Sequence, residues 1–300
     1  MNSHKSRILV TGANGQLGME LQKISPLFSG FDFIFTGRDD LPIEDHKAVK
    51  EYFKPGLFNF CINCAAYTAV DKAESETEKA YSINAEAVGN LAFTCSENNT
   101  TFIHISTDFV FDGKATEPYK ETDKTLPLNV YGKSKLLGED LVFKYNSTAI
   151  IIRTSWLYSS YGNNFVKTML RLMNEKESIN IVEDQLGCPT YAADLAVGIM
   201  KIIGKLDLPK NKNSGIYHFA NKGIISWYEF ALAIKELSGS KCIIYPIPSS
   251  GYRSAAQRPA YSALNTDKIR KVFGIEIPQW KDSLQKCLEV IRKYKDQAPR

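Results

Sequence analysis

Residues 7–18 read RILVTGANGQLG, and this stretch decides the fold class. Three apolar residues at 8–10 predict a buried strand over 7–10, and the amphipathic pattern that follows predicts a helix over 16–24. Between them, glycines at 12, 15 and 18 permit a tight turn, which lets backbone N–H groups and the helix N-terminus approach a pyrophosphate. The stretch therefore predicts a dinucleotide-binding turn; the alternative is a glycine-rich turn without a ligand.

The alternation of strand-like and helical patterns continues through the first half of the chain. The expected strands are 7–10, 31–35, 58–63, 101–105 and 149–153, and the expected helices are 16–24, 45–52, 74–95 and 130–145. Strands separated by helix-length segments pair in parallel, with the helices as crossovers. The pattern predicts the α/β class, with a doubly wound parallel sheet of the Rossmann type.

After Trp156 the pattern becomes irregular, with more loop and more proline. A further helix is expected over 226–237, where Ser226 and Glu229 have the spacing of a capping box. We expect residues 1–155 to form the NAD(P)-binding domain. Residues 156–300 would mostly form a smaller, mixed substrate-binding lobe, with some segments that return to the first domain. A substrate would bind in the cleft between the two.

Composition excludes several classes of protein. The chain has 37 Lys and Arg against 33 Asp and Glu, a net charge of +4 that is too weak and too scattered for a nucleic-acid binder. Its least polar stretch, 57–70, contains two asparagines and falls short of the roughly 20 apolar residues of a membrane span. The polar segment 1–6 leads into only three apolar residues, unlike a signal peptide. We therefore expect a soluble cytoplasmic protein with neither nucleic acid nor membrane as a partner.

Cys61 and Cys64 have the spacing of a redox or zinc motif, but their context argues against both. On one strand they would lie about 10 Å apart on opposite faces, whereas a disulfide needs Cα atoms within about 7 Å. The four histidines, at 4, 46, 104 and 218, are isolated from one another. We expect structural, reduced cysteines.

The residues after the second expected strand bear on which nicotinamide cofactor binds. An acidic residue there accepts a hydrogen bond from a ribose 2′-hydroxyl, whereas an arginine accommodates a 2′-phosphate. Arg38 is followed at once by Asp39 and Asp40. Arg38 favours NADPH, with NADH as the alternative cofactor; a surface ion pair between Arg38 and these aspartates is the structural alternative.

Tyr131 and Lys135 lie four positions apart, on one face of the helix expected over 130–145. Hydride reduction of a ketone leaves an alkoxide that needs a proton, which a tyrosine can supply. An ammonium beside the phenol would lower the pKa of Tyr131 and make it a better acid, and Lys135 also has the reach to contact the nicotinamide ribose. Thr107 follows the strand expected over 101–105 at the carboxyl edge of the sheet, where its hydroxyl would donate to the developing charge. An exposed Tyr–Lys pair is the alternative, and Lys133 is expected to be solvated.

The longer motifs resemble those of a known family, the dTDP-4-dehydrorhamnose reductases, which are extended short-chain dehydrogenase/reductases. The glycine spacing at 12–18 is typical of the extended type. The resemblance covers nearly the whole chain and rests on VTG at 10–12, NCAAYTAVDKAE at 63–74, STDFVF at 106–111, PLNVYG at 127–132, RTSW at 153–156, DQLGCPT at 184–190 and RPAYS at 258–262.

The resemblance implies that the 4-keto group of dTDP-4-dehydro-6-deoxy-L-mannose is reduced to give dTDP-L-rhamnose, so the partner would be a dTDP-sugar. The implied catalytic set is Tyr131, Lys135 and Thr107. Tyr131 and Lys135 are also expected to bind the cofactor. The other expected cofactor-binding residues are Gly12, Asn14, Gly15, Gln16, Leu17, Arg38, Ala65, Ala66, Tyr67 and Thr68. Of these, residues 15–17 would hold the pyrophosphate, and 66–68 would contact the ribose and the nicotinamide side.

The substrate-binding residues that the resemblance implies are Val70, Thr107, Asp108, Trp156 and Arg258. The Trp156 indole would be an apolar platform for the deoxysugar, and Arg258 would bind the diphosphate. The structural alternatives place Trp156 in the core and Asp108 as the cap of a turn.

Two positions depart from the family pattern. Pro42 and Ile43 stand where relatives usually carry an Asp beside the adenine, so only the backbone there would contact the base. Ala192 and Ala193 stand where some relatives have a carboxylate for a magnesium-bridged dimer, and Asp194 is displaced. We therefore expect no metal, and either a monomer or a homodimer.

Other functions of the same fold remain as alternatives. A nucleotide-sugar dehydratase needs an extra acid where Phe109 stands, which disfavours dehydration. A 4-epimerase, another nucleotide-sugar reductase, and a non-catalytic NADP-binding regulatory subunit like the β subunit of methionine adenosyltransferase stay open. The regulatory alternative would not need Tyr131, Lys135 and Thr107, and all three are present.

Overall fold

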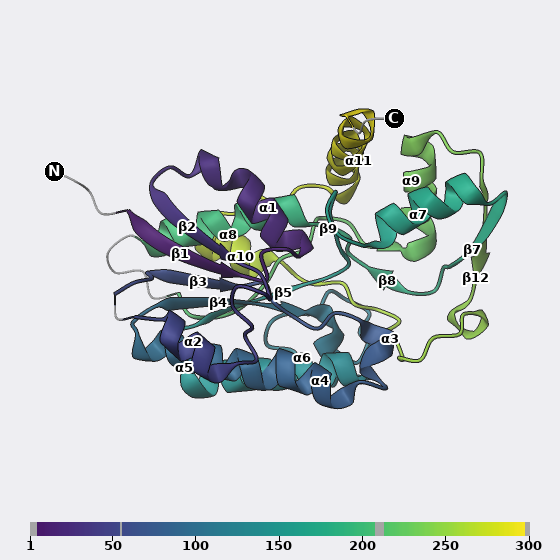
Figure 1. Cartoon of the computed structure of the whole chain (residues 1–300). Coiled ribbons are helices and arrows are strands. Elements are labelled where there is room, and N and C mark those ends of the chain that lie inside the picture. Colours follow the sequence, from purple (N-terminus) through teal and green to yellow (C-terminus); the bar gives the residue numbers. More distant parts are fainter. Residues whose placement is uncertain (1–4, 55, 208–212, 298–300) are drawn as a thin grey trace.

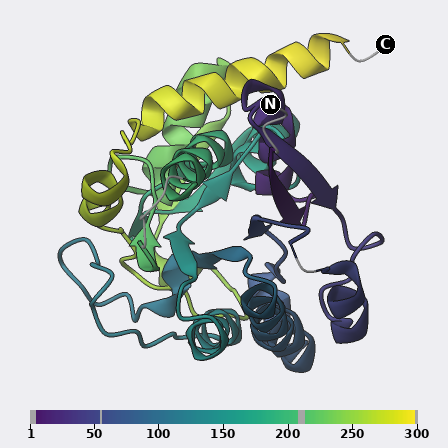
Figure 2. The same ribbon diagram turned by 90° about the vertical axis from the view of Figure 1, so that its left-hand side faces the viewer.

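The computed structural model describes residues 5–54, 56–207 and 213–297; the polar segment 1–4, with His4, lies outside the described residues. A six-stranded sheet with helices on both faces makes up one part of the molecule, and short two-stranded sheets with their own helices make up the other (Figures 1 and 2). The expected α/β class and Rossmann-type sheet are confirmed.

The large sheet is parallel throughout, with the strand order β10-β5-β4-β3-β1-β2. Its strands are β1 (Ser6–Thr11), β2 (Phe31–Thr36), β3 (Phe60–Asn63), β4 (Thr101–Thr107), β5 (Ile150–Thr154) and β10 (Gly215–His218). The chain runs from β1 outward to β2 and then returns to place β3 on the other side of β1. This reversal opens a crevice at the carboxyl ends of β1 and β3, where ligands of such sheets bind.

Most strand ends lie within one residue of the expectation, β4 extends two residues further, to Thr107, and two larger differences follow. β3 begins at Phe60 and not at 58, and Phe58 packs its ring against Phe53 and Tyr52. β10, the sixth strand, was not predicted, because four residues with one tyrosine and one histidine carry too little apolar pattern to indicate a strand.

The helices of the first half lie between these strands. They are α1 (Gln16–Ile24), α2 (His46–Tyr52), α3 (Val70–Ala73), α4 (Thr77–Tyr81), α5 (Ala87–Glu97) and α6 (Val130–Tyr145), with short turns η1 (Ser25–Leu27), η2 (Ser82–Glu86) and η3 (Asp108–Val110). α1 and α6 have the predicted bounds, and α2 starts one residue late because Asp45 is its N-cap.

The helix expected over 74–95 is present as an unbroken helical run over 77–97, but it is not a regular α-helix throughout. The structure has α4 and α5 joined by η2, a π-helical turn. Asn84 in η2 uses its side chain to bond the backbone of Tyr67 and the hydroxyl of Ser134, at 2.9–3.0 Å. Such widened turns occur often beside functional sites, and this one ties the crevice loop after β3 to α6.

Segments from the second half pack against the large sheet, as expected. α8 (Ala192–Leu206) and α10 (Asp267–Phe273) lie with α1 on one face, whereas α2, α5 and α6 lie on the other (Figure 1). Ile199 and Phe273 are buried on the first face, and Leu91 and Val142 on the second. Each such side chain contributes roughly 1.5–3 kcal/mol when it is fully buried, so both layers help to hold the crevice in place.

The remaining elements form what we call the small lobe. It comprises β6 (Leu157–Tyr158), β7 (Ser178–Val182), β8 (Leu186–Gly187), β9 (Thr190–Tyr191), β11 (Ile225–Ser226), β12 (Ile243–Ile247), α7 (Phe165–Glu175), α9 (Trp227–Ser238), η4 (Ser249–Gly251) and α11 (Trp280–Gln297).

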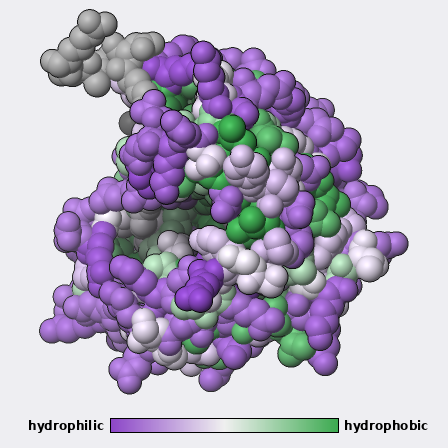
Figure 3. All heavy atoms as spheres, turned by 90° about the vertical axis from the view of Figure 1, so that its right-hand side faces the viewer, coloured by the Kyte–Doolittle hydropathy of each residue, from purple (hydrophilic) through white to green (hydrophobic). Residues whose placement is uncertain are grey.

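The small lobe has a core of its own around Phe230, Met169 and Leu284. The capping box is confirmed: Ser226 Oγ accepts from the Glu229 amide at 3.1 Å, and the Glu229 carboxylate accepts from the Ser226 amide at 2.7 Å. Figure 3 shows the face of the molecule that lies on the right in Figure 1. The surface there is deeply hollowed, with apolar residues inside the hollow.

The six cysteines are unpaired, and five of them are buried, Cys64 being half-buried. Within the described part of the chain, no three His, Cys, Asp or Glu side chains gather as a metal ion would require. No helix among residues 5–54, 56–207 and 213–297 has both the length and the apolar character needed to cross a membrane.

Candidate active site

The carboxyl end of β4 and the first turn of α6 bring Thr107 and Tyr131 together. Thr107 Oγ1 donates to Asp108 Oδ1 at 3.1 Å and accepts from the Phe109 amide at 3.2 Å. The same hydroxyl lies near enough to the Tyr131 phenol to lower its pKa. The Phe109 ring packs edge-on against the Tyr131 ring, with centroids 5.6 Å apart. The predicted phenol and hydroxyl therefore lie side by side.

The start of α6 is fixed from three directions. Asn129 is the N-cap, and its Oδ1 accepts from the Gly132 amide at 2.8 Å. Glu74 accepts from the Val130 amide, also at 2.8 Å. A Cβ on Gly132 would overlap the Phe109 carbonyl oxygen, so the absence of a side chain lets α6 come close to η3. These contacts place Tyr131 against the end of β4; neither Asn129 nor Gly132 was singled out from the sequence.

Lys135 is almost fully buried, with 1% of its surface exposed. Its Nζ donates to the Ile105 carbonyl at 2.7 Å and lies 3.1 Å from His104 Nε2. Burial lowers the pKa of Lys135 to about 8, and the Glu139 carboxylate opposes that shift. Lys133 is exposed, as expected.

The expected lowering of the Tyr131 pKa by Lys135 is wrong for this structure. Burial raises the pKa of Tyr131 to about 12; the Thr107 hydroxyl lowers it, and the nearby Asp108 carboxylate raises it further. The amine of Lys135 is turned to the Ile105 carbonyl of β4, so it does not offset the effect of burial on the phenol. Desolvation, which the sequence does not display, outweighs the charge effect.

A buried ion pair lies beneath α6. Arg153 of β5 donates from Nε and Nη2 to the Glu139 carboxylate at 2.9 and 2.6 Å. Ser106 of β4 donates to the same carboxylate. Because both charges are shielded from water and bonded in several directions, this pair joins α6 to β4 and β5 and keeps the register of the helix.

A cavity of about 260 Å³ opens over the glycine-rich turn. Gly12 has φ +66°, and a Cβ on it would lie 2.5 Å from the Ala65 amide nitrogen. α1 begins at Gln16, so the first amides of that helix have no intrahelical partner. The lining includes the predicted cofactor residues Gly12, Asn14, Gly15, Arg38, Ala65 and Ala66.

Other predicted cofactor residues lie outside this lining. Leu17 has its side chain in the core, so only its backbone can serve a ligand. Gln16 accepts from Asn164 of the small lobe at 2.9 Å, Tyr67 is buried, and Thr68 is exposed. Ile43 lines the cavity together with Leu41, at the position where we expect only the backbone to contact the adenine.

Arg38 stands at the rim of this cavity with 69% of its side chain exposed. Its Nη2 donates to Glu44 at 2.8 Å, whereas Asp40 accepts from the Gly37 amide. Arg38 therefore forms a surface ion pair, as the structural alternative predicted, but its partner is Glu44 and not an aspartate. Asp40 is engaged by the Gly37 amide in the turn between them.

A second cavity, of about 370 Å³, lies on the small-lobe side. Its lining includes Phe109, whose ring packs against Tyr131, and Ser262, whose hydroxyl lies near enough to Asp108 to lower the pKa of that carboxyl. Burial raises the pKa of the Asp108 carboxyl to about 7, against hydrogen bonds that lower it. Asp108 and Val70 lie outside the lining itself. Through Phe109 and Ser262 the cavity adjoins the catalytic residues.

Trp156 lines the second cavity, but one face of its indole is already covered. It stacks on Trp227 with ring centroids 3.6 Å apart and planes 8° from parallel. Trp156 has φ +46°, a strained conformation for a large residue. The predicted platform is therefore one half of a stacked pair. Its partner Trp227 is the first residue of α9, and no local pattern in the sequence indicates this role.

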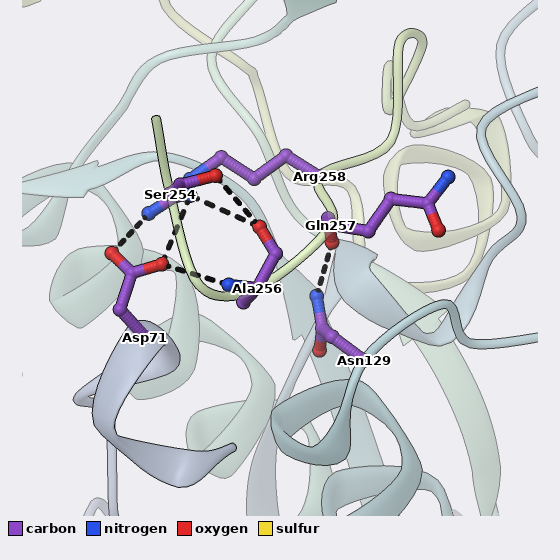
Figure 4. Close-up of polar contacts among 6 residues, drawn as sticks. All are labelled: Asp71, Asn129, Ser254, Ala256, Gln257 and Arg258. Carbon is purple, nitrogen blue, oxygen red and sulfur yellow. Dashed lines mark hydrogen bonds and ion pairs between the residues drawn. The ribbon is translucent and has the colours of Figure 1, made fainter. Parts of the chain in front are cut away.

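Residues 254–258, here called the strap, run from the small lobe across α3 and the start of α6. Figure 4 shows Arg258 and Asp71 pointing toward one another, with Nη1–Oδ1 and Nη2–Oδ2 distances of 3.1 and 2.7 Å. Asp71 also accepts from the Ala256 amide, and Asn129 donates to the Gln257 carbonyl. Arg258 lines the second cavity, as its predicted role requires, but its guanidinium is held by Asp71.

Known proteins match the chain over nearly its full length. A family model described as the RmlD substrate binding domain matches residues 6–293. A dTDP-4-dehydrorhamnose reductase of Aggregatibacter actinomycetemcomitans is 40% identical over 298 residues, covering 96% of this chain and 99% of that protein.

Two solved structures of similar proteins share the fold. A dTDP-4-dehydrorhamnose reductase of Clostridium acetobutylicum has a TM-score of 0.90 and 41% identity, and covers 95% of this chain and 99% of its own. One from Bacillus anthracis, solved in complex with NADP, has a TM-score of 0.90 and 39% identity with the same coverage. The chain belongs to the dTDP-4-dehydrorhamnose reductase family.

Proposed function

We propose that this protein uses NADPH to reduce the 4-keto group of dTDP-4-dehydro-6-deoxy-L-mannose, giving dTDP-L-rhamnose. The observation that carries the proposal is the placement of Tyr131 and Thr107 at the start of α6 and the end of β4, where the Thr107 hydroxyl lowers the pKa of the phenol and Phe109, which packs against Tyr131, lines the small-lobe cavity. Family membership supports the choice of substrate.

The cavity over the glycine-rich turn fits a nicotinamide dinucleotide. A side chain at Gly12 would collide with the Ala65 backbone, and the first amides of α1 are available for a pyrophosphate. The exposed guanidinium of Arg38 suits a 2′-phosphate, and the Bacillus anthracis relative was solved with NADP. Bound there, NADPH would supply the hydride, with NADH as a weaker substitute.

The chain's own residues supply the proton and hold the oxygen that receives it. A pKa of about 12 keeps the Tyr131 phenol protonated at physiological pH, so the acid is loaded before the reaction. As negative charge develops on the keto oxygen, the Tyr131 hydroxyl transfers its proton and the Thr107 hydroxyl donates a hydrogen bond. For this, the Thr107 hydroxyl must turn its single proton from Asp108 Oδ1 to the keto oxygen.

On the substrate side, we assign the small-lobe cavity to the dTDP-sugar. The Trp156–Trp227 pair offers an apolar wall, and Arg258 can exchange the Asp71 carboxylate for a diphosphate. Residues 1–155, with the returning β10, α8 and α10, would serve the cofactor, and the rest of 156–300 the sugar. We place the reaction in the cytoplasm, where unpaired thiols stay reduced, and take the acting unit to be a monomer or a homodimer.

The test is to incubate the purified protein with NADPH and the 4-keto dTDP-sugar, and to follow NADPH absorbance together with the sugar product. We expect one dTDP-L-rhamnose formed for each NADPH consumed. Tight NADPH binding without consumption would instead support the regulatory-subunit alternative. Conversion to an isomer without net NADPH consumption would support the epimerase alternative. A Tyr245→Phe variant, which alters an exposed tyrosine of β12, is the matched control for Tyr131→Phe.

A further inference from the structure

A row of buried polar side chains crosses the large sheet behind the candidate active site. In the strand register, Thr11 of β1 stands opposite Asn63 of β3, and Asn63 stands opposite His104 of β4. Lys135 of α6 meets the far end of this row at His104. All four side chains are buried, so water cannot substitute for a mismatched hydrogen bond.

The direction of each hydrogen bond in this row follows from one backbone amide. The Ala65 N–H can only donate, and it points at Asn63 Oδ1 at 3.1 Å; Thr11 donates to the same oxygen at 2.7 Å. The NH₂ group of Asn63 must therefore face His104, where Nδ2 lies 3.0 Å from Nδ1. Since an amide NH₂ only donates, Nδ1 of His104 must be the bare, accepting nitrogen.

A neutral imidazole with a bare Nδ1 carries its proton on Nε2. Burial holds the pKa of His104 well below its usual range, so the ring is neutral. The protonated Nε2 lies 3.1 Å from Lys135 Nζ, which can accept only as an uncharged amine. An ammonium would put N–H against N–H at this contact.

We propose that Asn63 and His104 are positioning residues for Lys135: they fix an imidazole N–H against its amine and so favour the uncharged form of the lysine while it rests against β4. The inference rests on the proposed function for its catalytic meaning. Protonation of Lys135 breaks the His104 contact and leaves the ammonium held by the Ile105 carbonyl alone, free to turn toward Tyr131.

The other ionisable groups around Lys135 do not explain this arrangement. Glu139, on the same helix, favours the charged lysine, but its carboxylate is engaged by Arg153 of β5. Tyr131, one turn earlier, is protonated, and Asp108 on η3 is bonded to Thr107. The geometry agrees with the pKa of about 8 for Lys135.

The first test reads the tautomer directly in the free protein by ¹⁵N NMR of labelled histidine, with the His104 signals assigned from a His104→Gln variant. Between pH 6 and 8 we expect a bare Nδ1 and a protonated Nε2 that do not titrate. A protonated Nδ1 would overturn the inference. This measurement needs neither cofactor nor substrate, so it is independent of whether the protein is a reductase.

The second test reverses the polarity of the row with Asn63→Asp. The carboxylate still accepts from Ala65 and Thr11, but now also accepts from His104, which moves the ring proton to Nδ1 and leaves Nε2 to accept from an ammonium. We expect the reversed ¹⁵N pattern and a rise in the Lys135 titration midpoint, followed by ¹⁵N-lysine NMR, of at least one pH unit, which is tenfold in proton affinity.

The matched control is Asn146→Asp, which buries a carboxylate at the other end of α6, where Thr148 donates to the side-chain oxygen. It should leave both signals unchanged. A folded Asn63→Asp protein with the native tautomer would overturn the inference, and if that variant fails to fold, the tautomer of the native protein still decides.

The kinetic consequence is measured in the reductase assay. If the charged lysine is the active form, kcat/KM for NADPH falls as pH rises through about 8, and Asn63→Asp moves this fall to higher pH. The expected tautomer with no turnover of any 4-keto sugar would refute the proposed function and leave the hydrogen-bond assignment standing. If the Asn63→Asp enzyme turns over but its kcat/KM falls at the same pH as that of the native enzyme, the positioning role is refuted and the proposed function stands.

Discussion

The floor and the rim of the cleft are built in opposite ways. By the floor we mean Thr107, Asp108, Tyr131 and Lys135, which lie at the end of β4 and on the first turns of α6, beneath the residues that line the two cavities and outside those linings themselves. The rim consists of two ion pairs, Arg38–Glu44 and Arg258–Asp71, whose arginine side chains are 69% and 22% exposed. Burial shifts the pKa values of the three ionisable groups of the floor, Asp108, Tyr131 and Lys135. At the rim, each arginine instead pairs with the carboxylate of one acidic residue.

We therefore expect the floor to carry out the reaction and the rim to recognise the phosphate groups of the ligands. Groups in the floor cannot be replaced without leaving a buried partner unbonded, so small changes there should affect turnover strongly. An exposed ion pair such as Arg38–Glu44 contributes only about 0–1 kcal/mol, so Arg38 can leave its carboxylate for a phosphate at little cost. The Arg258–Asp71 pair is less exposed and has two bonds, so it costs more to break. The following changes test that contrast, in decreasing order of expected effect.

Gly132→Ala should damage the floor most among these changes. The added Cβ would overlap the Phe109 carbonyl oxygen and push the first turn of α6 away from Thr107. We expect kcat to fall by more than about 100-fold and stability to fall by about 1–3 kcal/mol, measured by steady-state kinetics and urea unfolding. Gly204→Ala in α8 is the control, because no atom lies within 4 Å of its added Cβ. If the two substitutions had equal effects, the close approach of α6 to Phe109 would not be what keeps the enzyme active.

Thr107→Val removes the hydroxyl and keeps the shape of the side chain. Loss of one donor to a developing oxyanion costs on the order of 10²–10³ in kcat, and Asp108 and Phe109 also lose a bond. Thr107→Ser restores the hydroxyl and should recover most of the activity. If Thr107→Ser were as slow as Thr107→Val, the hydroxyl would not be the group that matters.

At the rim, Arg38→Gln should change cofactor choice and leave chemistry alone. A charge-assisted bond is worth about 1.5–3 kcal/mol, so we expect the Kd for NADPH to rise at least tenfold while the Kd for NADH stays the same, as measured by fluorescence titration. Arg7→Gln removes another exposed arginine, paired with Asp32 away from the cleft, and serves as the control. A parallel loss for both cofactors would show that Arg38 does not read the 2′-phosphate.

Asp71→Asn should have the smallest effect, and in the opposite direction. The strap loses its ion pair and Arg258 loses a competitor for the diphosphate, so KM for the dTDP-sugar should fall up to about fivefold, with kcat nearly unchanged. Asp32→Asn is the matched control. A higher KM would mean that Asp71 holds the strap in its binding position and does not compete with the substrate.

The sequence predicted the floor better than the rim. The glycine spacing at 12–18 and the Tyr131–Lys135 spacing are local patterns with local consequences, so the turn and the helix appear where expected. The partner of Arg258 lies 187 residues away in the chain, and that of Trp156 is 71 positions away; no local pattern indicates either. The pKa of Tyr131 was predicted in the wrong direction because burial is a property of the folded state. His104 and Asn63 looked like ordinary strand residues, and only the register shows that they form one row.

The central claim is that the Tyr131 phenol protonates the keto oxygen, and Tyr131→Phe tests it most directly. Single-turnover reduction of the 4-keto dTDP-sugar by the NADPH-loaded protein should slow by about 10²–10⁴-fold, while the Kd for NADPH remains within twofold of the native value. A variant that reduces the sugar within a few-fold of the native rate would contradict the account.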